Sequence, residues 1–140
     1  MRTSSVRLIA VVSLVLGLVA CGGGSGTGPS GGAKVDQTIT GTVDVFGTNI
    51  HTFTTTRSGR MTITLSWVNS TIDLDLYLTA DTCNVYPLFG ACDVLAQSIS
   101  GSGTSESVIR TVQNNQRFNI FVDNFSEVLG TNYEIRIEIE

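Results

Sequence analysis

Apolar and polar residues alternate strictly along four stretches of the chain. In 61–67 and 133–139 every second residue is large and apolar, and the residues between them are Thr, Ser, Glu and Arg. The stretches 72–78 and 118–122 follow the same period. A period of two places successive side chains on opposite faces of a pleated strand. Each stretch therefore predicts a β-strand with one buried face and one wetter face.

Four weaker stretches complete this pattern, and polar turns separate them. The weaker predicted strands are 38–45, 50–55, 94–100 and 105–112. Gly, Asn and Ser gather between the strands, as turns require. No stretch after residue 35 keeps a helical period. About eight short strands predict an all-β fold, an antiparallel β-sandwich that is jelly-roll-like.

The first twenty residues have a different pattern. Arg2 and Arg7 precede an uncharged apolar stretch, 8–20, which is followed directly by Cys21. This stretch is shorter than the roughly 20 residues that a membrane-spanning helix needs, and it suits the apolar region of an export signal. Its end, Leu-Val-Ala-Cys, resembles the lipobox of bacterial lipoproteins. That resemblance implies a signal peptide at 1–20 and a lipid on Cys21; the alternative is an ordinary signal peptide or membrane helix.

A Gly- and Ser-rich segment follows, and 21–34 is predicted to be the lipidated cysteine and a flexible tether. A Gly-rich chain of this length spans roughly 20 Å on average. The lipoprotein resemblance implies a membrane partner, through the lipid anchor, and a place in the bacterial cell envelope. Gly22 stands where lipoprotein sorting uses an Asp to retain proteins in the inner membrane. The outer membrane is therefore favoured if the source is Gram-negative.

The chain without its predicted signal peptide is acidic. Removal of Arg2 and Arg7 with the signal peptide leaves six basic residues against twelve acidic ones, a net charge of −6. Such a charge argues against nucleic acid as a partner and against binding anionic lipid headgroups through charge.

Two cysteines fall inside the predicted domain, 35–140. Cys83 and Cys92 form an even pair in an exported, oxidising setting, which predicts a disulfide. Two free thiols are the alternative. A zinc site is less expected, because His51 is the only histidine of the chain.

Several motifs of the domain match a known family together. They are Gly41-Thr42-Val43, Phe53, Gly59, the strand 61–67, Asp-Leu-Asp-Leu-Tyr-Leu at 73–78, and the Tyr-containing strand from Tyr133. This set resembles the bacterial pre-peptidase C-terminal (PPC) domain over about the whole of 35–140. The resemblance implies a β-sandwich whose relatives sit beside secreted peptidases. Two features depart from the family: the sequence at 114–118, where relatives often have Pro-Gly-Thr-Tyr, and the segment between the two cysteines.

Catalytic residues are hard to assemble from this sequence. His51 lies on a predicted strand and is expected to be a half-exposed strand residue rather than a catalytic base. Asp73 and Asp75 lie about 6–7 Å apart on one strand face and could be drawn as a glycosidase pair, but that spacing is common in strands. We therefore expect no enzymatic activity.

Calcium is the only cofactor that the sequence suggests. Asp73, Asp75 and Asp123 are candidate oxygen ligands. An EF-hand is excluded, because Leu78 and Asn84 stand where such a loop needs Gly and Glu. The alternative is that Asp73 and Asp75 accept hydrogen bonds from loop N–H groups and hold the turn.

Aromatic residues suggest where a partner could bind. Trp67 is in phase with the buried positions of its strand, so it is expected in the core rather than as a platform for sugars. Tyr77 and Phe121 are out of phase and are expected at the surface. Tyr86 and Phe89 lie on the segment between the cysteines, either as an exposed contact or folded back as a lid.

These expectations combine into one functional hypothesis. The chain is expected to be an envelope lipoprotein that acts as a non-catalytic binding module for a polysaccharide or a protein. One alternative is an accessory lipoprotein that assists the assembly of envelope or secreted enzymes. A hydrolase is the less favoured alternative.

Overall fold

The computed structural model describes residues 35–85 and 92–140, and most of these residues lie in β-strands. The strands are β1 (Val35–Val43), β2 (Thr48–Thr54), β3 (Gly59–Trp67), β4 (Leu74–Ala80), β5 (Val94–Ser98), β6 (Ser105–Val112), β7 (Arg117–Asn124) and β8 (Thr131–Ile139). Every stretch predicted to be a strand is one. β4 begins two residues later than the pattern predicts, because Ile72 still belongs to a turn in which its N–H donates to the carbonyl of Asn69. Within the described residues, no helix is long and apolar enough to span a bilayer.

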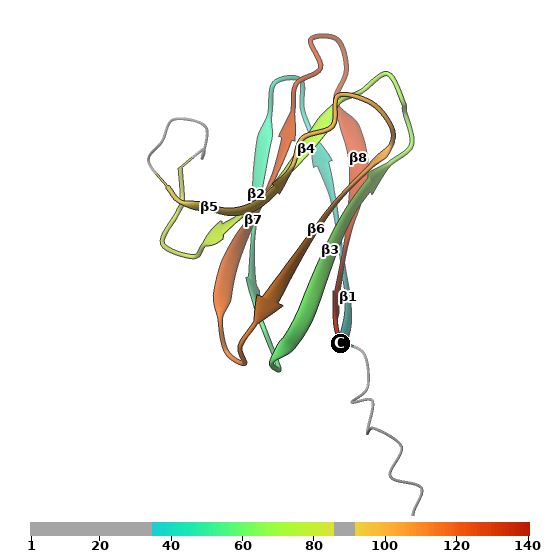
Figure 1. Cartoon of the computed structure of the whole chain (residues 1–140). Helices are drawn as coiled ribbons and strands as arrows, with labels where there is room; N and C mark the ends of the chain where they lie inside the picture. The colour runs from blue at the N-terminus through green and yellow to red at the C-terminus, as the bar shows by residue number, and fades with distance from the viewer. Residues whose placement is uncertain (1–34, 86–91) are drawn as a thin grey trace, which may run out of the picture. The chain divides into compact units, whose positions relative to one another are not determined.

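The described strands form two four-stranded sheets. Sheet A has the order β1-β8-β3-β6, and sheet B has the order β2-β7-β4-β5. All neighbouring strands are antiparallel. Apart from β4 and β5, consecutive strands lie in different sheets, so the chain crosses repeatedly from one layer to the other (Figure 1). This is the topology of a jelly roll, and the predicted antiparallel β-sandwich is confirmed.

The strand directions divide the described loops between two ends of the sandwich. The loops after β1, β3, β5 and β7 lie at one end, which we call the distal end (Figure 1). β1 begins and β8 finishes at the opposite end. Any chain that precedes Val35 therefore joins the domain at the end away from these four loops.

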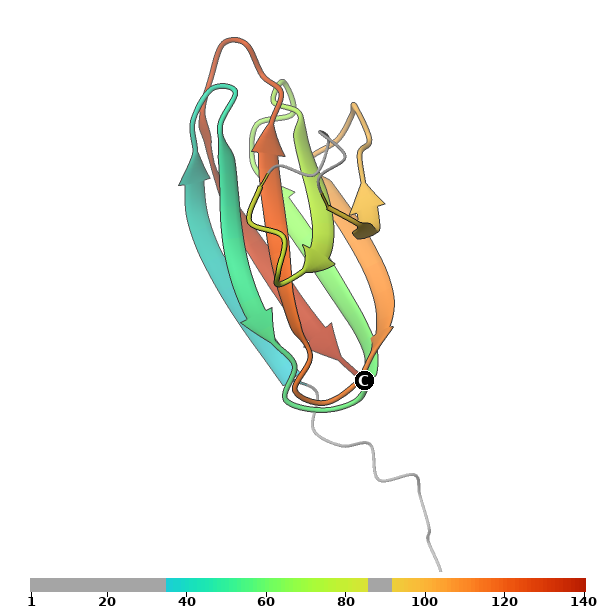
Figure 2. The ribbon, with the colours of Figure 1, turned by 90° about the vertical axis from the view of Figure 1, so that its left-hand side faces the viewer.

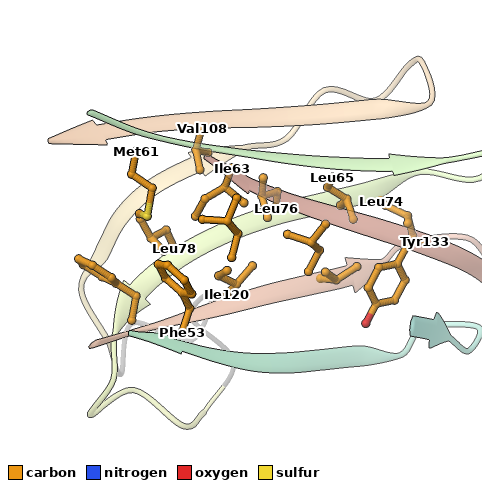
Figure 3. Packing of buried hydrophobic residues seen from close by; sticks show 14 of the residues in the cluster. Phe53, Met61, Ile63, Leu65, Leu74, Leu76, Leu78, Val108, Ile120 and Tyr133 are labelled. Atoms are coloured by element: carbon orange, nitrogen blue, oxygen red, sulfur yellow. The ribbon is translucent and has the colours of Figure 1, made fainter. Parts of the chain in front are cut away.

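The core lies between the sheets. In β3 the alternate residues Met61, Ile63, Leu65 and Trp67 are buried, and in β8 the same holds for every second residue from Tyr133. Leu74, Leu76 and Leu78 of β4 meet them from sheet B (Figure 3). Because Trp67 is buried with its Nε1 donating to the carbonyl of Ile72 at 2.9 Å, its predicted place in the core is confirmed.

Polar side chains close one open side of the sandwich, where β5 and β6 meet. Glu106 on β6 is buried and accepts hydrogen bonds from the hydroxyl of Ser98 and, at 2.9 Å, from the N–H of Ser100. Arg110 donates to the carbonyl of Leu95 on β5 at 3.0 Å. These contacts join the edges of the two sheets where the apolar core thins out.

Candidate functional site

Tyr133, His51 and Asn49 form a polar cluster between β8 and β2, on the other open side. The hydroxyl of Tyr133 lies 2.6 Å from His51 Nε2 and accepts a hydrogen bond from Asn49 Nδ2 at 2.9 Å. Burial lowers the pKa of His51. A neutral imidazole can accept a hydrogen bond from the Tyr133 hydroxyl, so His51 serves as a hydrogen-bond partner in the sandwich. Its predicted place as a half-exposed strand residue is confirmed.

Gly41 makes this cluster geometrically feasible. A Cβ atom at this position would lie 2.6 Å from Cζ of Tyr133 and closer still to its hydroxyl oxygen. The glycine of the Gly-Thr-Val motif thus provides the space through which the Tyr133 ring reaches β2. Two motifs that are far apart in sequence therefore belong to one contact.

Tyr77 and Phe121 are not at the surface, so that prediction is wrong. They lie opposite each other on β4 and β7 and are 1% and 0% exposed. Both point away from the main core, and they pack with Cys83 and Cys92 in a second small cluster. The pattern rule fails here because the chain around the disulfide covers the outer face of sheet B. A residue that is out of phase with the main core is then buried on the other face.

The predicted disulfide between Cys83 and Cys92 is confirmed, with Cα atoms 5.6 Å apart. Asn119 of β7 secures this segment, because its side-chain amide donates to the carbonyls of Cys83 and Asp81. Tyr86 and Phe89, predicted as contact residues between the two cysteines, lie outside the described residues, as does Cys21.

Asp75 and Asp123 are brought together as a cross-strand pair on the outer face of sheet B. They are 7% and 6% exposed. The Tyr77 hydroxyl donates to Asp75 at 3.0 Å, and the Thr48 hydroxyl donates to Asp123 at 2.5 Å. Burial raises the pKa of Asp75 to about 6; the hydrogen bond from Tyr77 opposes this rise, and the nearby carboxylates Asp73, Asp123 and Glu106 add to it.

Asp73 lies just before β4. Its carbonyl accepts a hydrogen bond from the N–H of Phe125, while its buried Oδ1 has no hydrogen-bond partner. Asp75 accepts its hydrogen bond from the Tyr77 hydroxyl rather than from a loop N–H. In the described part of the chain, no group of three or more His, Cys, Asp or Glu side chains is arranged to hold a metal ion.

The outer face of sheet A carries an open depression of about 570 Å³ near the distal end. Thr40, Thr42, Ser66, Asn132 and Glu134 contribute outward-facing polar side chains to it. The Thr42 hydroxyl donates to the side-chain oxygen of Asn132 at 2.6 Å. The lining could hydrogen-bond a hydroxyl-rich ligand.

Exposed apolar side chains gather on the loops after β1 and β7. We call this surface the distal tip, and both views place its two loops side by side (Figure 1 and Figure 2). From the sequence, the segments between the predicted strands are interpreted as polar turns, and this surface is therefore missed. The missed signal is the presence of large apolar residues in and beside two of those turns. The distal tip comprises Val45, Phe46, Phe125, Val128 and Leu129.

Buried Asn124 joins the two loops of the distal tip. Its side-chain amide donates to the carbonyls of Asp44 and Leu129, both at 2.9 Å, and its N–H donates to the carbonyl of Gly47. Its side-chain oxygen accepts from the N–H of Ser126. Hydrogen bonds of Asn124 thus hold the backbones of the two loops of the distal tip together.

No family model matches the sequence, and no curated protein matches it. Solved structures do resemble it. The pre-peptidase C-terminal domain of a collagenase from Bacillus anthracis is 14% identical, with a TM-score of 0.54 over 74% of this chain and 89% of that one. The Yersinia pseudotuberculosis-derived mitogen is 16% identical, with a TM-score of 0.55 over 76% and 86%.

A third similar structure is PliG of Aeromonas hydrophila, a periplasmic lysozyme inhibitor of g-type lysozyme. It is 13% identical, with a TM-score of 0.51 over 75% of this chain and 86% of that chain. At these identities the comparisons establish a shared fold. The resemblance to a PPC domain that the sequence motifs indicate is confirmed at the level of the fold.

Proposed function

We propose that this chain is a lipid-anchored, non-catalytic binding module of the bacterial cell envelope, and that its partner is a protein. The observation that carries the proposal is the distal tip, where Phe46 and Val128 are 64% and 77% exposed. Clustered exposed apolar side chains mark interaction surfaces, and aromatic residues dominate the energetics of protein interfaces. PliG, which has a similar fold, has a protein as its partner.

The absence of catalysis is part of this proposal. His51 lies against Tyr133 and is not paired with a carboxylate among the described residues. Asp75 and Asp123 each accept a hydrogen bond, from Tyr77 and Thr48 respectively, on a covered face. A glycosidase needs its two carboxyl groups on either side of an accessible substrate bond.

The anchor is tested by metabolic labelling of the full chain with radioactive palmitate. The wild-type chain should carry the label and fractionate with membranes. Cys21→Ser should accumulate as unprocessed precursor without label, because the thiol is the acceptor of the lipid. Normal labelling of this variant would refute the lipoprotein assignment.

Tyr86 and Phe89 are proposed as a second contact. The disulfide on either side of their segment limits its freedom and so reduces the entropy cost of ordering it in a complex. The test is co-purification of envelope proteins with the detergent-solubilised chain. Tyr86→Ser with Phe89→Ser should abolish co-purification with little change in melting temperature. A fall of many degrees would instead identify the segment as a lid over the domain.

A polysaccharide is the second candidate partner, and the depression on sheet A favours it. Carboxylate, amide and hydroxyl groups lie together there on β1, β3 and β8. Affinity electrophoresis through gels that contain envelope polysaccharide tests this candidate. Retardation that is lost in Glu134→Gln, whose polar group keeps the same size, would support it over the protein partner.

A further inference from the structure

Charge and apolar surface are distributed unevenly between the two ends of the sandwich. The four loops of the distal end, 44–47, 68–73, 99–104 and 125–130, contain three acidic residues and no Lys, Arg or His. Two of the acids, Asp44 and Glu127, are exposed beside the apolar residues of the distal tip. The arginines of the described residues lie in the strands or at the opposite end: Arg57, Arg60, Arg110, Arg117 and Arg136.

Phe46 occupies a backbone conformation that its side chain does not favour. Its φ angle is 51°, in the left-handed region where Gly or Asn is usual. A bulky side chain is disfavoured in such a conformation. Burial of the ring does not offset this backbone strain, because the Phe46 side chain is 64% exposed. A strained, exposed aromatic residue points to a function outside the isolated fold.

The chemistry of the distal tip favours one class of binding partner over the others. A second copy would bring Asp44 and Glu127 against the same acids, and an anionic bilayer surface would repel them. A cationic protein complements both the apolar side chains and the acidic residues of the distal tip. An apolar pocket on such a protein would receive Phe46 and Val128, and its basic rim would face the two carboxylates.

We propose that the distal tip is the docking surface for a cationic protein. This inference rests on the proposed function and names the surface and the partner class. The tip lies at the end of the sandwich opposite the start of β1.

The test is site-specific photo-crosslinking of the full chain in cells of its source. The photoreactive residue p-benzoylphenylalanine replaces Phe46 in one variant and Val128 in another. Ile109, 52% exposed on the outer face of β6, is the matched control position. Positions 46 and 128 should give the same adduct, with a protein whose isoelectric point exceeds about 8, and position 109 should not.

Affinity for the purified crosslinked protein then tests the contact itself. Phe46→Gly should weaken binding at least tenfold at unchanged melting temperature, because glycine accepts the φ angle of this position. Asp44→Asn with Glu127→Gln should weaken binding in low salt and have less effect in high salt. Ile109→Ser should bind as the wild type does.

Several outcomes would overturn the inference. They are an adduct with a second copy of the chain, with lipid or with glycan, an adduct with an acidic protein, and no adduct above the position-109 control. If a protein partner binds but the tip variants bind it normally, only this inference fails and the proposed function stands. If no protein partner is found by crosslinking or co-purification, both fail.

Discussion

At the scale of single residues, Asp75 differs most from an ordinary surface carboxylate. Its strand position predicts a wet face, yet it lies opposite Asp123 beneath a covered surface. The sequence identifies both residues as notable acids, but the pairing depends on the register between β4 and β7. No local pattern encodes that register, because the two strands are some forty residues apart along the chain.

The raised pKa of Asp75 predicts a pH-dependent stability. The native state holds the proton more tightly than the unfolded chain, since its pKa is about 6 against an ordinary value of 3.8. The stabilisation that the protonated Asp75 carboxyl gives the native state is therefore fully present below pH 3.8 and is lost as the pH rises through about 6. Asp75→Asn keeps an acceptor for Tyr77 without the charge. Its free energy of unfolding should exceed that of the wild type by about 1–2 kcal/mol at pH 7.5.

Urea unfolding of both proteins in EDTA at pH 5 and pH 7.5 measures this difference. The stability advantage of Asp75→Asn should shrink at pH 5, where the wild-type carboxyl is largely protonated. An Asn variant that is less stable than wild type at both pH values would contradict the assigned burial cost.

Calcium binding by Asp73, Asp75 and Asp123 stays a prediction. Burial raises the pKa of Asp75, and the carboxylates around it add to the rise, so a cation between these carboxylates would relieve their repulsion. If calcium binds there, millimolar calcium should raise the melting temperature, because a ligand of the native state stabilises it by mass action. Asp73→Asn should remove the increase. A melting temperature that calcium leaves unchanged in the wild type would exclude the site.

At the scale of elements, the alternation of residues predicts the strands well and their outer faces less well. For β3 and β8 one face meets the core and the other is open, so the pattern identifies the buried residues. For β4 and β7 both faces are covered, and Tyr77 and Phe121 are buried against expectation. The pattern shows which face of a strand meets the main core, but it does not show which loop covers the opposite face.

The loop that carries the disulfide should hold this second layer in place. Replacing Cys83 and Cys92 by Ser should lower the free energy of unfolding by about 2–3 kcal/mol, because the open loop gains entropy in the unfolded chain. Denaturant unfolding with and without a reducing agent measures the loss. The reductant should destabilise the wild type by a similar amount and leave the variant unaffected. Equal stability of wild type and variant in the absence of reductant would contradict this role.

The contact between β1 and β8 gives a prediction about Gly41. Gly41→Ala should destabilise the domain by about 1–3 kcal/mol, because the added methyl group overlaps with the Tyr133 ring and displaces it from His51. Gly101→Ala is the matched control, since its Cβ would have only Asp73 Oδ2 nearby, at 4.0 Å. Equal urea midpoints for the two variants would show that the Tyr133 cluster tolerates displacement.

At the scale of the whole molecule, the domain has an apolar, acidic end and an arginine-bearing remainder. The net negative charge is predictable from composition. That the distal end carries acidic residues but no arginine follows from the jelly-roll topology, which gathers four loops at one end. The distal tip likewise appears only when Phe46 and Phe125, distant in sequence, lie on loops joined through Asn124.

The central claim is that this chain binds a protein at the envelope, and quantitative co-purification tests it most directly. The full chain is isolated in mild detergent from membranes, in parallel with a Phe46→Gly, Val128→Ser variant, and bound proteins are quantified by mass spectrometry. The account predicts a protein enriched in near-equal amount with the wild type and depleted at least tenfold with the variant. A protein bound equally by the two chains would contradict only the assignment of the contact to the distal tip. No protein near stoichiometric amount with the wild type would contradict the central claim.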